Sequence, residues 1–199
     1  MSRLQPPGLS LVGDWEVEAT VPGGGTYTGR VIARPAGDAV EVEWDITAGR
    51  YVGLGLAAAG AWYVACGEDW AGLGLALLGA GGTARWAPAP GRGEIGVTTL
   101  VPAGAGRWEA GPTTAAAFPF AAVSLGRGGY LLEAELAGGP TGRGLALPFP
   151  GGHAVAWYPR FDQTVILRYA AGREPGTLEA VWGLGGHRAL AAETLRPWG

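Results

Sequence analysis

Two pairs of glutamates have the spacing that could most directly support catalysis. Glu41 and Glu43, like Glu133 and Glu135, stand two positions apart in the sequence. In a strand each pair would lie on one face about 7 Å apart, given a rise of about 3.3 Å per residue. Paired carboxylates can serve as acid and base in glycosidases. Each pair alternates with apolar residues, however, so we expect a solvated outer strand face rather than a catalytic pair.

The other reactive residue types form no recognised catalytic or metal-binding motif. His153 and His187 are the two histidines, and the single Cys66 excludes an intrachain disulfide and a paired-cysteine zinc site. Ser124 lacks the preceding glycine of a nucleophile elbow. Residues 53–58 loosely match a dinucleotide fingerprint, but the run continues as a strand where a helix is required. We therefore assign no catalytic residue, metal ligand or cofactor, and we favour a non-enzymatic role while leaving an enzyme open.

Alternating polar and apolar residues predict the elements that must position any site. Residues 13–21, 26–34 and 39–47 read as strands, separated by glycine and proline turns. Further short strands follow to residue 101, about eight in 90 residues, and no segment has a capped helical period. This spacing is typical of an antiparallel β-barrel or β-sandwich, so the predicted fold class is all-β.

The chain then repeats this plan. Gly13-Asp14-Trp15-Glu16 is matched by Gly106-Arg107-Trp108-Glu109, and the central hairpin 50–68 is matched by 141–162. We predict two tandem repeats of about 93 residues, 13–105 and 106–199, related by pseudo-two-fold symmetry and packed together as one unit. A flexible N-terminal arm, 1–12, precedes them. Each repeat could form its own lobe, or the two could merge into one barrel or sandwich.

The composition narrows the possible partners and locations. Nine tryptophans and a 48% apolar content supply a real core, despite 38 glycines and 15 prolines. The net charge is -3 and all 14 basic residues are scattered arginines, so no basic stripe exists for nucleic acid. The first 12 residues lack the apolar run of a signal peptide, and no window predicts a membrane helix. We expect a cytoplasmic protein with no nucleic-acid or membrane partner.

The repeat resembles repeats found in uncharacterised bacterial proteins. Its G-x-W start, at Trp15 and at Trp108, also resembles the first strand of lipocalin-like and avidin-like barrels. That resemblance implies a barrel, and it implies ligand binding to a lesser degree.

The candidate binding residues are aromatic side chains of the two central hairpins, together with one arginine. From the repeated motif we place Arg143 where the first repeat has Leu54. On an internal face it would be a buried charge in need of an anionic partner, whereas on an exposed strand it would not. The predicted ligand-binding residues are Tyr51, Trp62, Tyr63, Arg143, Trp157 and Tyr158. They suggest a binding barrel for a small apolar or aromatic ligand with an anionic end. The alternative is a structural or interaction module that acts through its surface or as a homo-oligomer.

Overall fold

The computed structural model describes residues 9–88, 95–104, 106–111, 118–126, 129–139 and 141–199, and these form sixteen strands and one short 3-10 turn. The first eight strands are β1 (Gly13–Thr20), β2 (Thr26–Ala36), β3 (Ala39–Ile46), β4 (Gly49–Ala58), β5 (Ala61–Gly67), β6 (Gly74–Gly79), β7 (Thr83–Pro88) and β8 (Gly96–Pro102). The second eight are β9 (Arg107–Ala110), β10 (Ala122–Leu125), β11 (Leu132–Ala137), β12 (Arg143–Phe149), β13 (Gly152–Trp157), β14 (Val165–Ala171), β15 (Leu178–Leu184) and β16 (Ala191–Pro197), with the turn η1 (Phe161–Gln163) before β14. The predicted all-β class is confirmed.

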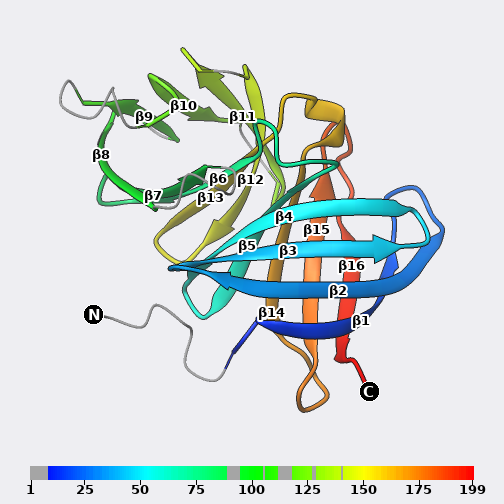
Figure 1. Ribbon diagram of the computed structural model, residues 1–199. Coiled ribbons are helices and arrows are strands. Elements are labelled where there is room, and N and C mark those ends of the chain that lie inside the picture. Colours follow the sequence, from blue (N-terminus) through cyan, green and yellow to red (C-terminus); the bar gives the residue numbers. More distant parts are fainter. Residues whose placement is uncertain (1–8, 89–94, 105, 112–117, 127–128, 140) are drawn as a thin grey trace.

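The strands close into two antiparallel barrels of eight strands each, which lie side by side (Figure 1). Barrel A has the order β1-β16-β15-β14-β5-β4-β3-β2, and barrel B has the order β10-β11-β12-β13-β6-β7-β8-β9. Each barrel therefore takes five strands from one repeat and three from the other. The repeats exchange their last three strands, so neither barrel consists of one repeat alone.

Strand registers show which positions of the two repeats are equivalent. In the β4–β5 hairpin Leu54 pairs with Ala65, and in the β12–β13 hairpin Leu145 pairs with Ala156. Both hairpins turn through two residues, after Ala58 in one and after Phe149 in the other. Positions in these hairpins thus correspond at an offset of 91 residues, as expected for two repeats with pseudo-two-fold symmetry.

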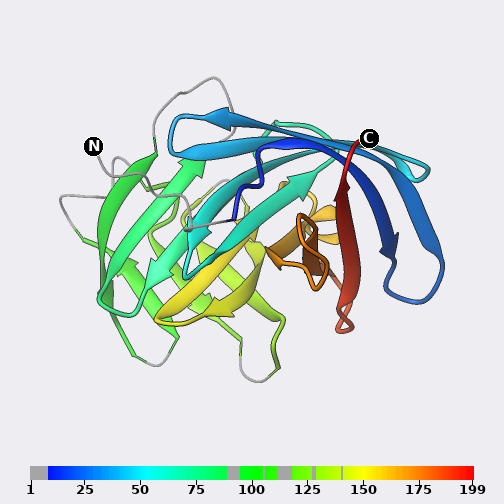
Figure 2. The ribbon, with the colours of Figure 1, turned by 90° about the horizontal axis from the view of Figure 1, so that it is seen from below.

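Three apolar cores follow from this arrangement. One lies inside barrel A, one lies inside barrel B, and the third lies between the barrels. The third core is formed by outward faces of β4, β5 and β14 from barrel A and of β6, β12 and β13 from barrel B, which lie together at the centre of the molecule (Figure 2). These central strands carry apolar residues on both faces because both faces are buried.

Strand β5 illustrates this two-sided burial. Trp62, Val64 and Cys66 point into barrel A, whereas Tyr63 and Ala65 belong to the core between the barrels. All seven residues of β5 are buried. Alternation of polar and apolar residues, the usual sign of a strand with one wet face, is therefore absent here.

The two ends of barrel A differ. At the end where β1 begins, Leu9 and Leu11 are buried in the barrel core. The indole N–H of Trp62 donates to the Leu9 carbonyl at 3.2 Å, and that of Trp15 donates to the Leu11 carbonyl at 2.9 Å. These two residues, which fall within the predicted N-terminal arm, close that end of the barrel.

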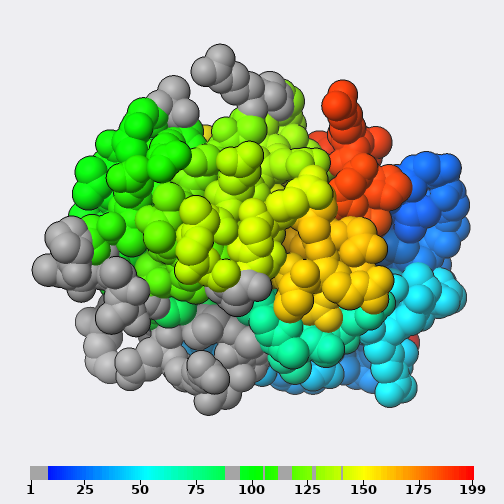
Figure 3. Space-filling view, turned by 90° about the horizontal axis from the view of Figure 1, so that it is seen from above, coloured from blue at the N-terminus to red at the C-terminus, as the bar shows by residue number. Residues whose placement is uncertain are grey.

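The opposite end of barrel A is bordered by turns and by η1. Figure 3 shows the gold segment that contains η1 between the green and yellow mass of barrel B and the blue, cyan and red parts of barrel A. Among the described residues, no helix is long and apolar enough to cross a membrane.

Candidate functional site

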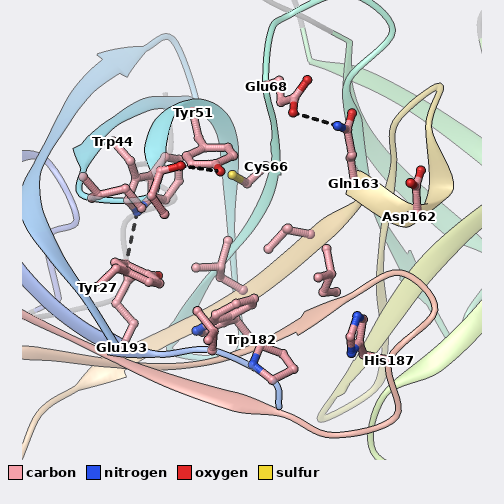
Figure 4. Close-up of a pocket in the computed structure, with 17 residues that line it drawn as sticks. Tyr27, Trp44, Tyr51, Cys66, Glu68, Asp162, Gln163, Trp182, His187 and Glu193 are labelled. Atoms are coloured by element: carbon pink, nitrogen blue, oxygen red, sulfur yellow. Dashed lines mark hydrogen bonds between the residues drawn. The ribbon is translucent and has the colours of Figure 1, made fainter. Parts of the chain in front are cut away.

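A cavity of about 410 Å³ opens at this end of barrel A (Figure 4). Its wall is largely aromatic and aliphatic, and includes Tyr27, Trp44, Tyr51, Leu167 and Trp182. Its polar residues are Glu68, Asp162, Gln163, His187 and Glu193. In Figure 4 Glu193, Tyr27 and Trp44 lie on one side of the cavity, and Glu68, Asp162, Gln163 and His187 lie on the other. The cavity is thus an apolar chamber with a carboxylate inside and polar groups near its opening.

Glu193 is the buried polar centre of the site, with 1% of its surface exposed. It lies on β16 between Ala191 and Leu195, at a position whose side chain points into the barrel. The Tyr27 hydroxyl donates to Glu193 Oε2 at 2.5 Å, and the Tyr169 hydroxyl donates to Oε1. The carboxylate thus receives hydrogen bonds from β2, which lies beyond β1 on one side of β16, and from β14, which lies beyond β15 on the other side.

Trp44 on β3 adds a third donor. Its indole N–H reaches Glu193 Oε1 at 3.4 Å. An indole nitrogen can only donate, and an ionised carboxylate only accepts, so this geometry suits the charged form of Glu193. Three hydrogen bonds use three of the roughly four acceptor positions of a carboxylate.

Burial and hydrogen bonding act on this cluster in opposite directions. Burial raises the pKa of Glu193 above its usual 4.5, while the bonds from Tyr169, Tyr27 and Trp44 lower it. The net effect is a raised pKa. Burial, followed by the charge of Glu193, also raises the pKa of Tyr27, Tyr169 and Cys66, so all three keep their protons at neutral pH.

Barrel B shows what the same scaffold contains without this cluster. Ala84 pairs with Thr98 in β7–β8 as Ala180 pairs with Glu193 in β15–β16, so Thr98 is the counterpart of Glu193. By register or by position in the repeat, Phe120, Leu136 and Leu78 are the counterparts of Tyr27, Trp44 and Tyr169. All three are apolar and buried inside barrel B. The fold therefore does not require the polar cluster of barrel A.

The counterpart of Cys66 is a much larger side chain. With the 91-residue offset, Cys66 corresponds to Trp157, whose ring lies inside barrel B. That ring packs edge-on against Phe120, with centroids 5.0 Å apart. A small side chain stands in barrel A where an indole occupies space in barrel B.

The polar groups at the opening are solvent-accessible. The Gln163 amide donates to Glu68 Oε1 at 2.7 Å, which links η1 to the end of β5. Asp162 and His187 are exposed beside this pair. No group of three or more histidine, cysteine, aspartate or glutamate side chains in the described part of the chain could hold a metal ion.

Of the six predicted binding residues, Tyr51 lines the cavity. Its hydroxyl donates to the Ala48 carbonyl at 3.2 Å. Trp62 also points into barrel A, but at the closed end, where it bonds to Leu9. These two aromatic residues therefore face the same barrel from opposite ends.

Three other predicted residues face different cores. Tyr63 and Tyr158 lie in the core between the barrels, where the Tyr63 hydroxyl donates to the Pro148 carbonyl at 3.3 Å. Trp157 lies inside barrel B. The structure does not bring these side chains together around one cavity, because neighbouring residues of a strand point to opposite faces.

Arg143 lies on the outside of barrel B, with 53% of its side chain exposed. It forms an ion pair with Glu133 at 2.6 Å, and its guanidinium lies 3.7 Å from the ring centroid of Phe161. Strand register makes Arg143 the counterpart of Val52 in the first repeat, not of Leu54, because Leu145 is the counterpart of Leu54. Among the described residues its charge has a partner, so no anionic ligand is needed to balance it. A ligand contact of Arg143 stays a prediction.

Sequence reasoning missed Glu193, Tyr27, Trp44 and Tyr169 as a group. They come from β2 and β3 near the start of the chain and from β14 and β16 near its end, and three of them are aromatic residues that any core could contain. The available signal was Glu193 itself, an acidic residue at an inward position of an alternating strand where the other repeat has Thr98.

Comparison with models of known protein families and with curated protein sequences finds no match. Functional conclusions for this chain therefore depend on the cavity and its residues.

Proposed function

We propose that the protein is a non-enzymatic binding protein that holds a small, largely apolar ligand in the cavity of barrel A. The observation that carries this proposal is the difference between the two barrels. Eight-stranded barrels are just wide enough either to be filled by side chains or to hold one small ligand. Inside barrel B, the Trp157 ring packs against Phe120 at the position where barrel A has Cys66.

The size and lining of the cavity support a small organic ligand. A volume of about 410 Å³ falls within the range of about 300–1,000 Å³ that is common for small-molecule sites. Such sites are mainly apolar and aromatic with a few placed polar groups, which Trp44, Tyr51 and Trp182 together with Glu193 provide here.

The charges around the cavity disfavour the anionic ligand end suggested by Arg143. Glu68, Asp162 and Glu193 line the cavity, and no arginine of the described residues lines it. An anion would be repelled by these carboxylates. We therefore expect the polar end of the ligand to be neutral or positively charged.

Titration with N-phenyl-1-naphthylamine, a neutral apolar dye, tests the proposal. The dye should bind the wild-type protein at one site per chain with increased emission. Cys66→Trp, which introduces the side chain that barrel B has at the equivalent position, should weaken binding at least tenfold by filling the cavity. Val97→Trp adds the same indole at a side chain that is 67% exposed, and should leave binding unchanged.

Circular dichroism must show that the Cys66→Trp variant is folded, and Cys66→Leu provides a smaller filling residue if it is not. Equal dye binding by wild type and a folded, filled variant would contradict the proposal. Absence of binding by the dye and by a panel of one-ring and two-ring aromatic compounds would favour the surface-interaction alternative instead.

A further inference from the structure

Glu193 is a buried carboxylate whose described hydrogen-bond partners carry no charge. Its hydrogen-bond donors, Tyr27, Tyr169 and Trp44, are all neutral groups. In the part of the chain that the structure describes, no arginine or histidine forms an ion pair with it. Burying a charge without an opposite partner is costly, so a site of this kind is completed by a cation or by a proton.

The aromatic wall favours a cation of a particular kind. Tyr27, Trp44, Tyr51 and Trp182 line the cavity. The electron-rich faces of such rings attract ammonium groups, and the attraction strengthens when water is excluded. A hydrated metal ion would gain little here, because the wall is mostly apolar. An organic cation can use both the rings and the carboxylate.

The mouth of the cavity carries carboxylates, as the interior does. Glu68 and Asp162 are exposed at the mouth, and His187 lies beside them among the described lining residues. A mouth lined by carboxylates attracts cations and repels anions during approach. The entrance and the interior therefore select for the same charge.

We propose that the ligand of barrel A is an organic cation, an amine or ammonium group on a small apolar body, whose charged end is bound by Glu193. This inference depends on the proposed binding function and specifies its ligand class. The ammonium group donates to the remaining acceptor position of the Glu193 carboxylate and lies against the Tyr27 and Trp44 rings. The apolar body fills the space between Leu167, Trp182 and Tyr51.

The unpartnered indole of Trp182 does not point to a different ligand. Its buried N–H has no hydrogen-bond partner among the described residues, which could suggest a ligand with an acceptor group. The indole of Trp86 is also buried without a partner, and it occupies the equivalent position in barrel B. The unpaired indole thus belongs to the scaffold of both barrels, whereas the carboxylate belongs to barrel A.

Binding of a cation should depend on pH through Glu193. The groups that face Glu193 are Tyr27 from β2, Trp44 from β3, Cys66 from β5 and Tyr169 from β14. The tyrosines and the cysteine remain neutral at neutral pH because burial raises their pKa values. Glu193 is then the group of this cluster that titrates, and cation affinity should rise as pH rises through its raised pKa.

Three probes with the same body and different ends test the inference on the full chain. Phenylbutylamine, phenylbutanol and phenylbutyrate should be titrated by isothermal calorimetry and by quenching of tryptophan fluorescence. The amine should bind at least tenfold more tightly than the alcohol, and the carboxylate should bind most weakly. Glu193→Gln should lower amine affinity at least tenfold and change alcohol affinity less than threefold. Glu43→Gln is the matched control and should change amine affinity less than threefold, because Glu43 is exposed on the outer face of β3 and does not line the cavity.

Each outcome separates this inference from the proposed function. Equal binding of amine and alcohol, tighter binding of the carboxylate, or an unchanged amine affinity in Glu193→Gln would overturn the cation inference and leave the binding function standing. No binding of any of the three, together with no binding of the apolar dye, would overturn both. If Glu193→Gln does not fold, the wild-type amine affinity must rise with pH while the alcohol affinity stays constant. A flat amine profile would overturn the inference.

Discussion

Separating the two repeats should prevent either from folding as a monomer. A fragment of residues 1–105 contains β1–β5 of barrel A but lacks β14–β16, and its own β6–β8 lack their partners β9 and β13. Strands β1 and β5 would each lose one neighbour, which leaves two open edges and an uncovered barrel interior. Unpaired edges and exposed apolar faces promote aggregation.

The size of the loss can be worked out from the core of barrel A. Five large buried side chains of that core come from the second repeat, namely Leu167, Tyr169, Leu178, Trp182 and Leu195. Burying a large apolar side chain contributes about 1.5–3 kcal/mol, so the five together contribute about 7–15 kcal/mol. That equals the net stability of a typical domain, about 5–15 kcal/mol, so the fragment should not retain a folded barrel A.

The assay is to prepare fragments 1–105 and 106–199 separately and then mix them in equal amounts. Each fragment alone should aggregate, or should lack near-ultraviolet circular dichroism and a cooperative thermal transition. The mixture should form a one-to-one complex with the spectrum of the intact chain, as judged by size-exclusion chromatography with light scattering. A single fragment that melts cooperatively as a monomer would refute the exchange of strands between the repeats.

Three further predictions concern single residues. The stability of Glu193→Gln relative to wild type should rise as pH rises above about 4.5. The unfolded carboxyl ionises there while the pKa of the folded carboxyl is raised, so wild type loses stability with rising pH and the variant does not. Thermal melts from pH 4 to 8 would show the reverse trend if the fold stabilised the charged form of Glu193. Gly53→Ala should lower the free energy of unfolding, measured by chemical denaturation, by about 1–3 kcal/mol. The added Cβ would lie 2.6 Å from the Trp44 ring and 2.8 Å from the Ala65 carbonyl oxygen. Gly81→Ala, with open space around it, is the control and should lower it by less than about 1 kcal/mol. Arg143→Leu should change stability by less than about 1 kcal/mol, because the ion pair of Arg143 with Glu133 is exposed. It should change dye or amine affinity by less than twofold, because Arg143 does not line the cavity of barrel A. A tenfold loss of affinity would instead support Arg143 as a binding residue.

The sequence predicted the strands and the duplication because both depend on local patterns. Alternation in residues 39–47 correctly placed Val42 and Trp44 inside and Glu43 outside. The repeated G-x-W start and the repeated central hairpin correctly indicated two equivalent units. Turn residues limit how far such patterns can shift, so strand positions could be read from one sequence.

The pairing of strands could not be predicted in the same way. Strand β5 could pair with β6, which follows it directly, or with β14, which is the counterpart of β6 in the other repeat. Both candidates carry apolar residues on both faces, so the pattern does not distinguish them. The segment 68–73 carries the chain from barrel A to barrel B, and this crossing depends on the core between the barrels, which forms only when both repeats are present.

The same two-sided burial explains why the aromatic cluster was predicted as one site. Tyr63 and Trp62 are neighbours in the sequence and point into different cores. A strand with one wet face would have shown which aromatic residues share a side, but β5 has none. An inward acidic residue is a more informative signal in such a protein, because burial of the Glu193 carboxylate is costly without specific partners whereas burial of an aromatic ring is itself favourable.

Strand exchange also bears on how barrel A can keep a cavity and a buried charge. Both features reduce stability, and a free-standing eight-stranded barrel would have to compensate for them within its own core. Here β14–β16 complete barrel A and are continuous with β9–β13 of barrel B, so the barrels are joined by chain exchange as well as by the core between them. Loss of barrel A would therefore remove support from barrel B, and the packed core of barrel B helps to hold barrel A closed. A duplicated scaffold of this kind lets one copy supply stability while the other contains a cavity and a buried carboxylate.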